Sequence, residues 1–278
     1  MKREDVDVVF ISGQRGLYQR AGCAMAGHEM RFSFAPAALT PHMENGIGVD
    51  EARDDDLSAL VALHQNEPVR FIRSPWEWGQ FLSVYRITPQ GAEPPFGVRR
   101  IWVVKRGEQP LAYFVLSVGR DTASPAGYVQ EFAGNRRAAL SGMAVLGARI
   151  GLGSLTGSCL PSDLEMLDGL TAAGTKAQPS SIGGHRMSFL TPDILRRYDN
   201  WVTERAGTEY AGKLSLAGTG ETWHLSHGGE HMPTGNLENT NAVLWGDAFA
   251  SAQQGSPADD IWHRILPLPF VLPGMNYI

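Results

Sequence analysis

The sequence is short of cysteine, of long apolar runs and of positive charge. Its 278 residues include two cysteines, Cys23 and Cys159, far apart and outside any CxxC or zinc-finger spacing, which argues against a disulfide framework and predicts a reduced chain. No apolar run is long enough to span a membrane, and the opening MKREDVDVVF lacks the apolar stretch of a signal peptide, so we expect a cytoplasmic protein. With 24 Lys and Arg against 29 Asp and Glu, neither nucleic acid nor an anionic membrane is an expected partner.

Several catalytic motifs are also missing. The sequence has no G-x-S-x-G nucleophile elbow, which argues against a serine hydrolase, and no HExxH, so a metalloprotease has no support. The glycine-rich stretch IGLGSLTG lacks both GxGxxG and the lysine of a P-loop, and we interpret it as a turn.

What is present indicates a folded α/β chain. Apolar residues make up 43% of the sequence and charged residues 19%, enough for a buried core and too few charges for disorder. The 32 glycines and 17 prolines predict many turns. The length suits one large domain or two small ones, at about 150 residues per domain.

A short unit opens the chain. Residues 6–12 (VDVVFIS) form an apolar run of strand length, LYQRAG suits one or two helical turns, and residues 28–34 (HEMRFSF) alternate like a strand. The following APAALTPHMENG is rich in proline and small residues, as in a linker. We therefore expect residues 1–43 to be a strand–helix–strand unit with a linker, and residues 44–278 to be a second domain.

The second domain alternates strand and helix patterns. From residue 47 to residue 190 the predicted order is strand, two helices, three strands, helix, strand, helix, strand. Asn135 is the expected N-cap of the helix that follows the strand AGYVQEF. A C-terminal extension from about residue 191 adds helices and two strand-like pieces.

This order of elements resembles the GCN5-related N-acetyltransferase (GNAT) fold, a mixed α/β central sheet, flanked by helices, that splays to admit acetyl-CoA. The stretches VQEFAGNRRAAL and PLPFVLPGMNYI look like parts of bacterial acetyltransferase-like proteins with two such domains in tandem. The N-terminal unit looks like the last third of a first domain. Tyr18 and Gly22 match the family's Y-x-x-x-G-F, and Cys23 departs from its aromatic residue. The resemblance implies a truncated first domain.

The resemblance also implies a chemistry, the transfer of an acetyl group from acetyl-CoA to an amine of a small molecule or peptide. A glutamate, often acting through water, takes the amine proton, and a tyrosine protonates the departing thiolate. Backbone N–H groups of an R/Q-x-x-G-x-G/A loop at a helix N-terminus hold the diphosphate. On this chain the resemblance points to Tyr18 as the acid and to Glu131 as the base, although an exposed carboxylate without function is an alternative for Glu131.

The diphosphate loop departs from the family pattern. Where it is expected, after AGYVQEF, the chain has one glycine, Gly134, followed by Asn135, Arg136 and Arg137. Two arginines in the first turn oppose the helix dipole but would suit a phosphate, and a solvated basic turn is the alternative. In the second domain Leu170 stands where the family's tyrosine is expected.

Two further clusters attract attention. His224, His227 and His231 lie close together in HLSHGGEH, a spacing that could hold Zn²⁺ or Ni²⁺ if the chain turns sharply at the two glycines. Surface histidines in a turn are the alternative. Trp76 and Trp78 are two residues apart on a predicted helix and do not share a face, so we expect one in the core and the other at a cleft or partner surface.

Three functions follow from these observations. The first is an acetyltransferase that needs its cofactor loop from elsewhere, and the second is a non-catalytic GNAT-like binding or interaction module. The third is a metal-dependent enzyme that uses the histidine cluster. Because unpaired strand edges rarely stay exposed, we also expect a second copy or a partner subunit to complete the first domain, or the remnant to dock on the second domain.

Overall fold

The computed structural model describes residues 6–13, 15–25, 27–39, 43–87, 98–119, 125–182, 185–246 and 261–272. The chain divides into two compact units, and each combines segments that are distant in sequence. Unit 1 comprises residues 1–28 and 181–270, and unit 2 comprises residues 29–180 and 271–278. This division differs from the one expected between residues 43 and 44.

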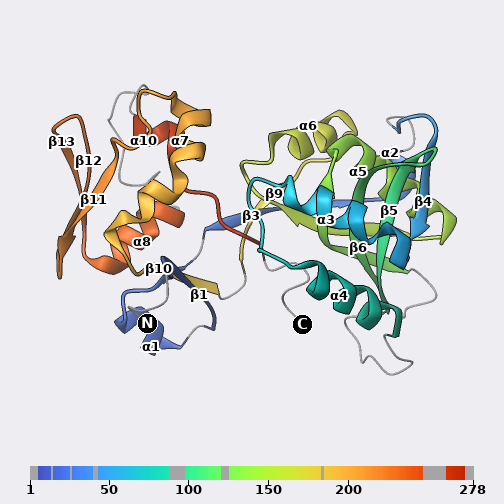
Figure 1. Ribbon diagram of the computed structural model, residues 1–278, viewed down its shortest axis with the longest axis horizontal. Helices are drawn as coiled ribbons and strands as arrows, with labels where there is room; N and C mark the ends of the chain where they lie inside the picture. The colour runs from blue at the N-terminus through green and yellow to red at the C-terminus, as the bar shows by residue number, and fades with distance from the viewer. Residues whose placement is uncertain are drawn as a thin grey trace. The chain divides into compact units, whose positions relative to one another are not determined.

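Unit 2 is built on a seven-stranded mixed sheet in the order β4-β5-β6-β7-β8-β3-β9 (Figure 1). Neighbouring strands from β4 to β7 are antiparallel, as are β8 and β3, whereas β7 and β8 are parallel. The strands are β3 (His28–Phe34), β4 (Ile47–Glu51), β5 (Val98–Arg106), β6 (Gln109–Val118), β7 (Ala126–Gly134), β8 (Ser154–Cys159) and β9 (Gln178–Ser181).

Helices cover both faces of this sheet. The side chains of β6 alternate, so that Phe114 packs in one core with α5 and α6, whereas Val115 packs in another with α3 and α4. The expected mixed sheet flanked by helices is therefore confirmed. The helical elements of unit 2 are α2 (Pro36–Leu39), η2 (Asp54–Asp56), α3 (Leu57–Gln65), α4 (Pro75–Ile87), α5 (Arg136–Arg149) and α6 (Leu164–Ala172).

Helix α5 is the helix of unit 2 whose start the sequence predicts most clearly. Asn135 caps it as predicted, because its side chain accepts a hydrogen bond of 2.8 Å from the N–H of Ala138. Small residues then allow close packing on the sheet. A Cβ added at Gly142 would lie 2.5 Å from Cγ2 of Val104, so a larger residue there would push α5 away from β5.

Two strands pair on the other side of the boundary that was expected between residues 43 and 44. The sequence pattern correctly predicts a strand at residues 28–34, but β3 pairs with β8 in unit 2 and not with the other N-terminal strands. Conversely, β10 (His185–Phe189) lies between β1 (Val8–Ser12) and β2 (Ala24–Met25) in a three-stranded sheet of unit 1. The N-terminal strand–helix–strand unit is thus not self-contained.

Asn241 stabilises this sheet of unit 1 from α8. Its buried side chain accepts a hydrogen bond from the N–H of Phe189 at 3.0 Å and donates to the carbonyl of Gly22 at 2.8 Å. It therefore ties β10 to the turn after α1. The other elements of unit 1 are α1 (Gly16–Arg20), η3 (Pro192–Tyr198), α7 (Asp199–Ala206), the antiparallel sheet of β11 (Ser215–Thr219), β12 (Thr222–His227) and β13 (Glu230–Gly235), α8 (Leu237–Trp245) and α10 (Ile261–Ile265).

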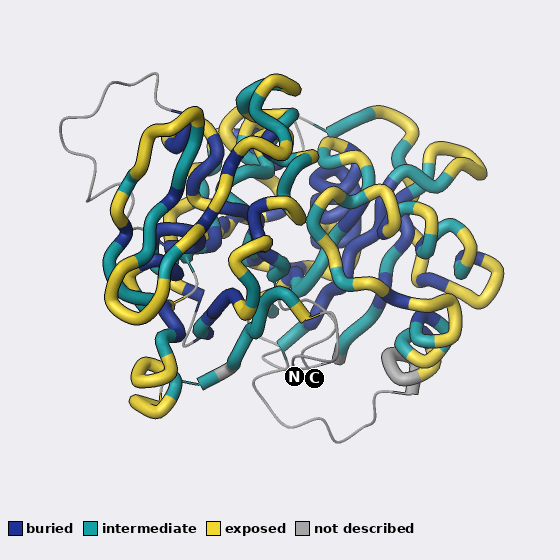
Figure 2. Tube along the Cα trace, turned by 60° about the vertical axis from the view of Figure 1, so that its left-hand side comes forward, coloured by how far each residue is buried: buried dark blue, intermediate teal, exposed yellow. Residues whose placement is uncertain are grey.

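Buried and exposed segments alternate along the chain in both units (Figure 2). Of the paired tryptophans of α4, Trp78 is fully buried, as predicted for one of the two, and Trp76 is 71% exposed. None of the described helices combines the length and the hydropathy that a membrane-spanning helix needs.

Candidate functional site

The central sheet of unit 2 opens between its two parallel strands. Their pairing ends where Val129 lies opposite Gly157, whereas β7 continues to Gly134 and β8 to Cys159. At the same point β7 carries a β-bulge at Gln130, marked by a register shift against β6, and a bulge bends its strand. The carboxyl end of β7 therefore diverges from β8, and α5 begins directly beyond it.

Glu131 lies just after this bulge, and both of its carboxylate oxygens accept hydrogen bonds. Arg73 donates to its two oxygens at 2.6 and 2.7 Å, and the hydroxyl of Tyr113 donates to Oε1 at 2.7 Å. The side chain of Arg73 is 1% exposed and that of Glu131 is 13% exposed. The residue that the family resemblance assigned as the base is thus one half of a buried, bidentate ion pair.

Aromatic rings hold the Arg73 guanidinium in place. They lie 5.3 to 5.9 Å from its central carbon and belong to Phe71, Trp78 and Phe81. Burial alone would lower the pKa of Arg73, but the hydrogen bonds and charge of Glu131 outweigh it and raise that pKa. Burial and the charge of Glu131 raise the pKa of Tyr113 well above its usual value. Tyr113 therefore stays protonated and serves as a donor.

Replacing Tyr113 with Phe should lower the free energy of unfolding by about 2 kcal/mol, because the ring remains while a buried carboxylate loses its hydroxyl donor. Urea denaturation followed by circular dichroism measures the loss. Tyr128→Phe on the neighbouring strand is the matched control, since the side chain of Tyr128 is 44% exposed, and it should change stability by less than about 0.5 kcal/mol. Equal losses in the two variants would contradict a structural role for the Tyr113 hydroxyl.

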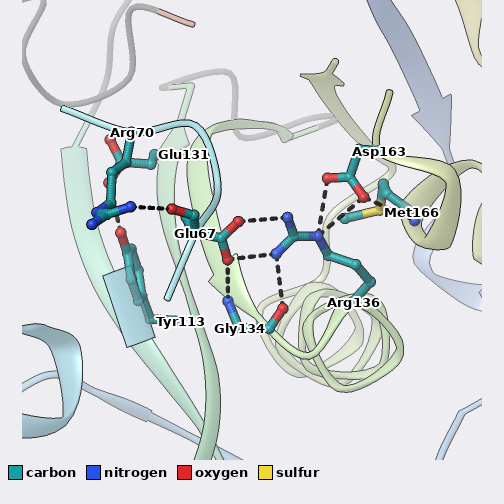
Figure 3. A network of polar contacts seen from close by, with 8 residues as sticks. All are labelled: Glu67, Arg70, Tyr113, Glu131, Gly134, Arg136, Asp163 and Met166. Carbon is teal, nitrogen blue, oxygen red and sulfur yellow. Dashed lines mark hydrogen bonds and ion pairs between the residues drawn. The ribbon is translucent and has the colours of Figure 1, made fainter. Parts of the chain in front are cut away.

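A second polar cluster surrounds the start of α5 (Figure 3). Glu67, from the loop between α3 and α4, accepts hydrogen bonds from the N–H of Gly134 at 2.7 Å and from both terminal nitrogens of Arg136 at 2.7 and 2.6 Å. Nε of Arg136 also donates to Asp163, the N-cap of α6, at 2.9 Å. Burial opposes the charged form of Arg136, yet the hydrogen bonds of Glu67 and the charge of Asp163 raise its pKa.

These contacts decide whether a diphosphate fits at this position. The N–H of Gly134 and the guanidinium of Arg136 already bind carboxylates, and the first-turn N–H of Ala138 is held by Asn135. A phosphate arriving here would also meet the negative charges of Glu67 and Asp163. As arranged, the residues at the start of α5 do not fit the diphosphate of acetyl-CoA.

The structure brings most of the predicted site residues together in unit 2, whereas Tyr18 belongs to unit 1. Glu131, Gly134, Asn135 and Arg136 share the junction of β7 and α5 in unit 2, with Arg137 exposed beside them. Tyr18 belongs to α1 of unit 1 and is half-buried, with its ring against the backbone of Gly13.

Sequence reasoning missed Glu67 and Asp163, and it placed Arg73 near the substrate-side helices but did not predict its pairing with Glu131. Glu67 and Arg73 come from a loop more than fifty positions before their partners, and Asp163 lies 27 positions after Arg136. The one available signal was the alternation of charged and apolar residues in NEPVRFIRS, which is unusual for a solvated loop.

The histidine cluster does not form a metal site. The rings of His224 and His231 lie 5.2 Å apart, and that of His231 also meets the Ser226 hydroxyl, whereas His227 packs against Tyr210. Within the described ranges, no group of three or more His, Cys, Asp or Glu side chains is placed to hold a metal ion. The metal-dependent alternative therefore has no support.

Comparison of sequences and of structures gave different results. No family model and no curated protein matches the sequence. The fold, in contrast, is similar to that of a GCN5-related N-acetyltransferase from Anabaena variabilis, with a TM-score of 0.55 and 10% identity. This match covers 87% of this chain and 64% of that one. For a GCN5-related N-acetyltransferase from Kribbella flavida the TM-score is 0.51 at 13% identity. This match covers 95% of this chain and 68% of that one.

A conserved protein from Enterococcus faecalis is similar to the same degree, with a TM-score of 0.54 and 10% identity over 97% of this chain and 71% of that one. The chain thus spans 64 to 71% of the length of these three structures. At such low identity the similarity concerns the fold. Together with the mixed sheet, the bulged β7 and its divergence from β8, it establishes that this chain has the fold of the GCN5-related N-acetyltransferases.

Proposed function

We propose that unit 2 is a GNAT-fold module that does not catalyse acyl transfer and serves as a binding or interaction module. The observation that carries this proposal is the engagement of Glu131 by Arg73 and Tyr113. A general base must present a free lone pair to the amine. Taking up the amine proton would remove the negative charge of Glu131 that faces the buried guanidinium of Arg73, and disrupting a buried ion pair costs about 3–5 kcal/mol.

The state of the cofactor position supports the same proposal. In this fold the start of α5 would receive the diphosphate of acetyl-CoA, and there the donors of Gly134 and Arg136 bind Glu67. No reaction step is therefore assigned to residues of unit 2.

An acetyltransferase is the second candidate, and the placement of Tyr18 favours it. Tyr18 is partly accessible on α1, which has no buried residue. With Tyr18 as the acid, the chain would transfer an acetyl group from acetyl-CoA to an amine of a small molecule or peptide. The diphosphate and the amine proton would then need groups other than those at the β7–α5 junction.

The interaction role has its own support in unit 1. In the described part of the chain β1 is an edge strand, its apolar residues Val8–Ile11 are only half-buried, and Leu17 on the following helix is 60% exposed. Such an edge is a template for strand addition. We propose a polypeptide partner here, either a second copy or another subunit, and light scattering across a concentration series distinguishes the two.

Titration calorimetry with acetyl-CoA tests the main proposal. The full chain should give no heat, no thermal shift at millimolar cofactor and no acetylated product with a panel of amines. Turnover that is lost in Glu131→Gln but kept in Tyr18→Phe would contradict the proposal. The opposite pattern, with activity dependent on Tyr18, would favour the second candidate and leave unit 2 non-catalytic.

A further inference from the structure

The loop between α3 and α4, residues 66–74, is attached to the end of β7 and the start of α5 by charges of opposite sign. Near its beginning Glu67 binds Gly134 and Arg136, and near its end Arg73 binds Glu131. The loop is also tied to itself, since Arg70 donates to the carbonyl of Glu67. Loop 66–74 therefore lies across the junction that the candidate site occupies.

The surroundings of the Glu67 carboxylate are those of a bound anion. A backbone N–H ahead of a helix and a guanidinium in bidentate contact are the groups that bind phosphates and carboxylates in proteins. Here all three contacts are 2.6 to 2.7 Å long, and the side chains of Glu67 and Arg136 are both 13% exposed. The Glu67 carboxylate differs from a bound anionic ligand only in that it belongs to a side chain of the protein itself.

We propose that Glu67 is an internal latch that keeps this anion position closed, and that its removal opens the position to the diphosphate of a CoA-type ligand. The inference rests on the proposed function, because it explains why unit 2 is closed to acyl-CoA. Attachment to the loop gives the carboxylate a high effective concentration, so a free phosphate competes poorly with it. Like-charge repulsion by Glu67 and Asp163 opposes the phosphate as well.

The test uses the full chain and two substitutions of the latch. Glu67→Gln removes the charge and keeps the size, and Glu67→Ala removes the acceptor altogether. The probes are inorganic pyrophosphate and CoA, followed by the NMR shift of the Gly134 amide and by calorimetry. Wild-type protein should show no shift at Gly134, whereas both variants should show a saturable one and bind at least about tenfold more tightly, a difference of about 1.4 kcal/mol.

Asp163→Asn is the matched control. It removes the other carboxylate from the same guanidinium and retains an acceptor for the N-cap of α6, but it leaves the N–H of Gly134 bound to Glu67. Its gain in affinity should be clearly smaller than that of Glu67→Gln. Adding Arg136→Ala to Glu67→Ala should abolish the gain.

Two results would overturn the latch. One is a pyrophosphate-induced or CoA-induced shift of the Gly134 amide in the wild type, and the other is no gain in either Glu67 variant when circular dichroism shows both to be folded. Failure of the proposed function looks different. Acetyl transfer by the wild type that is lost in Glu131→Gln, without any shift at Gly134, would contradict a non-catalytic unit 2 and leave the latch intact.

Discussion

Replacing Arg73 with Met should destabilise unit 2 by about 3–5 kcal/mol, since removing one partner of a buried ion pair leaves the other charge uncompensated. Here the remaining charge would be that of Glu131, whose side chain is only 13% exposed and which accepts a hydrogen bond from the hydroxyl of Tyr113. Urea denaturation followed by circular dichroism gives the loss in the free energy of unfolding. We expect the largest effect of any single substitution at the site.

The double variant Arg73→Met with Glu131→Gln separates the ion pair from simple packing. It removes both charges and leaves an amide oxygen to accept from Tyr113, so at least half of the lost stability should return. A single variant that loses less than about 1 kcal/mol would show that the pair contributes little to stability. A double variant as unstable as the single one would assign the loss to packing of the arginine side chain.

Gly134→Ala should cost about 3 kcal/mol or more, because the residue is both strained and crowded. Gly134 has a φ of +90°, and an added Cβ would lie 2.4 Å from the carbonyl oxygen of Leu111 and 2.9 Å from Cα of Ala112. Both contacts are with backbone, which cannot rotate away. The end of β7 would have to move, and with it the N–H that Glu67 binds.

Gly151→Ala provides the control for backbone strain alone. Gly151 follows α5 with a φ of +69°, and an added Cβ there meets nothing within 4 Å. It should therefore cost only about 1 kcal/mol. If the two alanine variants lose the same stability in urea denaturation, steric contact at Gly134 is not what requires the glycine.

Part of this protein follows from local sequence. The alternation in HEMRFSF predicted β3, and Asn135 before a run of small residues predicted α5 and its cap. The order of strands and helices between residues 47 and 190 was enough to suggest the GNAT fold, which the structural similarity confirms. These features depend on hydrogen bonds and side-chain periodicity within a few residues, so a single sequence contains them.

Only the tertiary structure decided what the predicted site residues contact. Glu131 and Arg136 were assigned to the base and to an anion site, yet they bind Arg73 and Glu67, which lie 58 and 69 positions away. The pairing of β3 with β8, and of β10 with β1 and β2, was likewise outside any local pattern. The physical reason is the distance along the chain over which each kind of interaction acts. Propensity and periodicity act between near neighbours in the chain, whereas strand partners and buried ion pairs are chosen by packing between segments that meet only in the folded state.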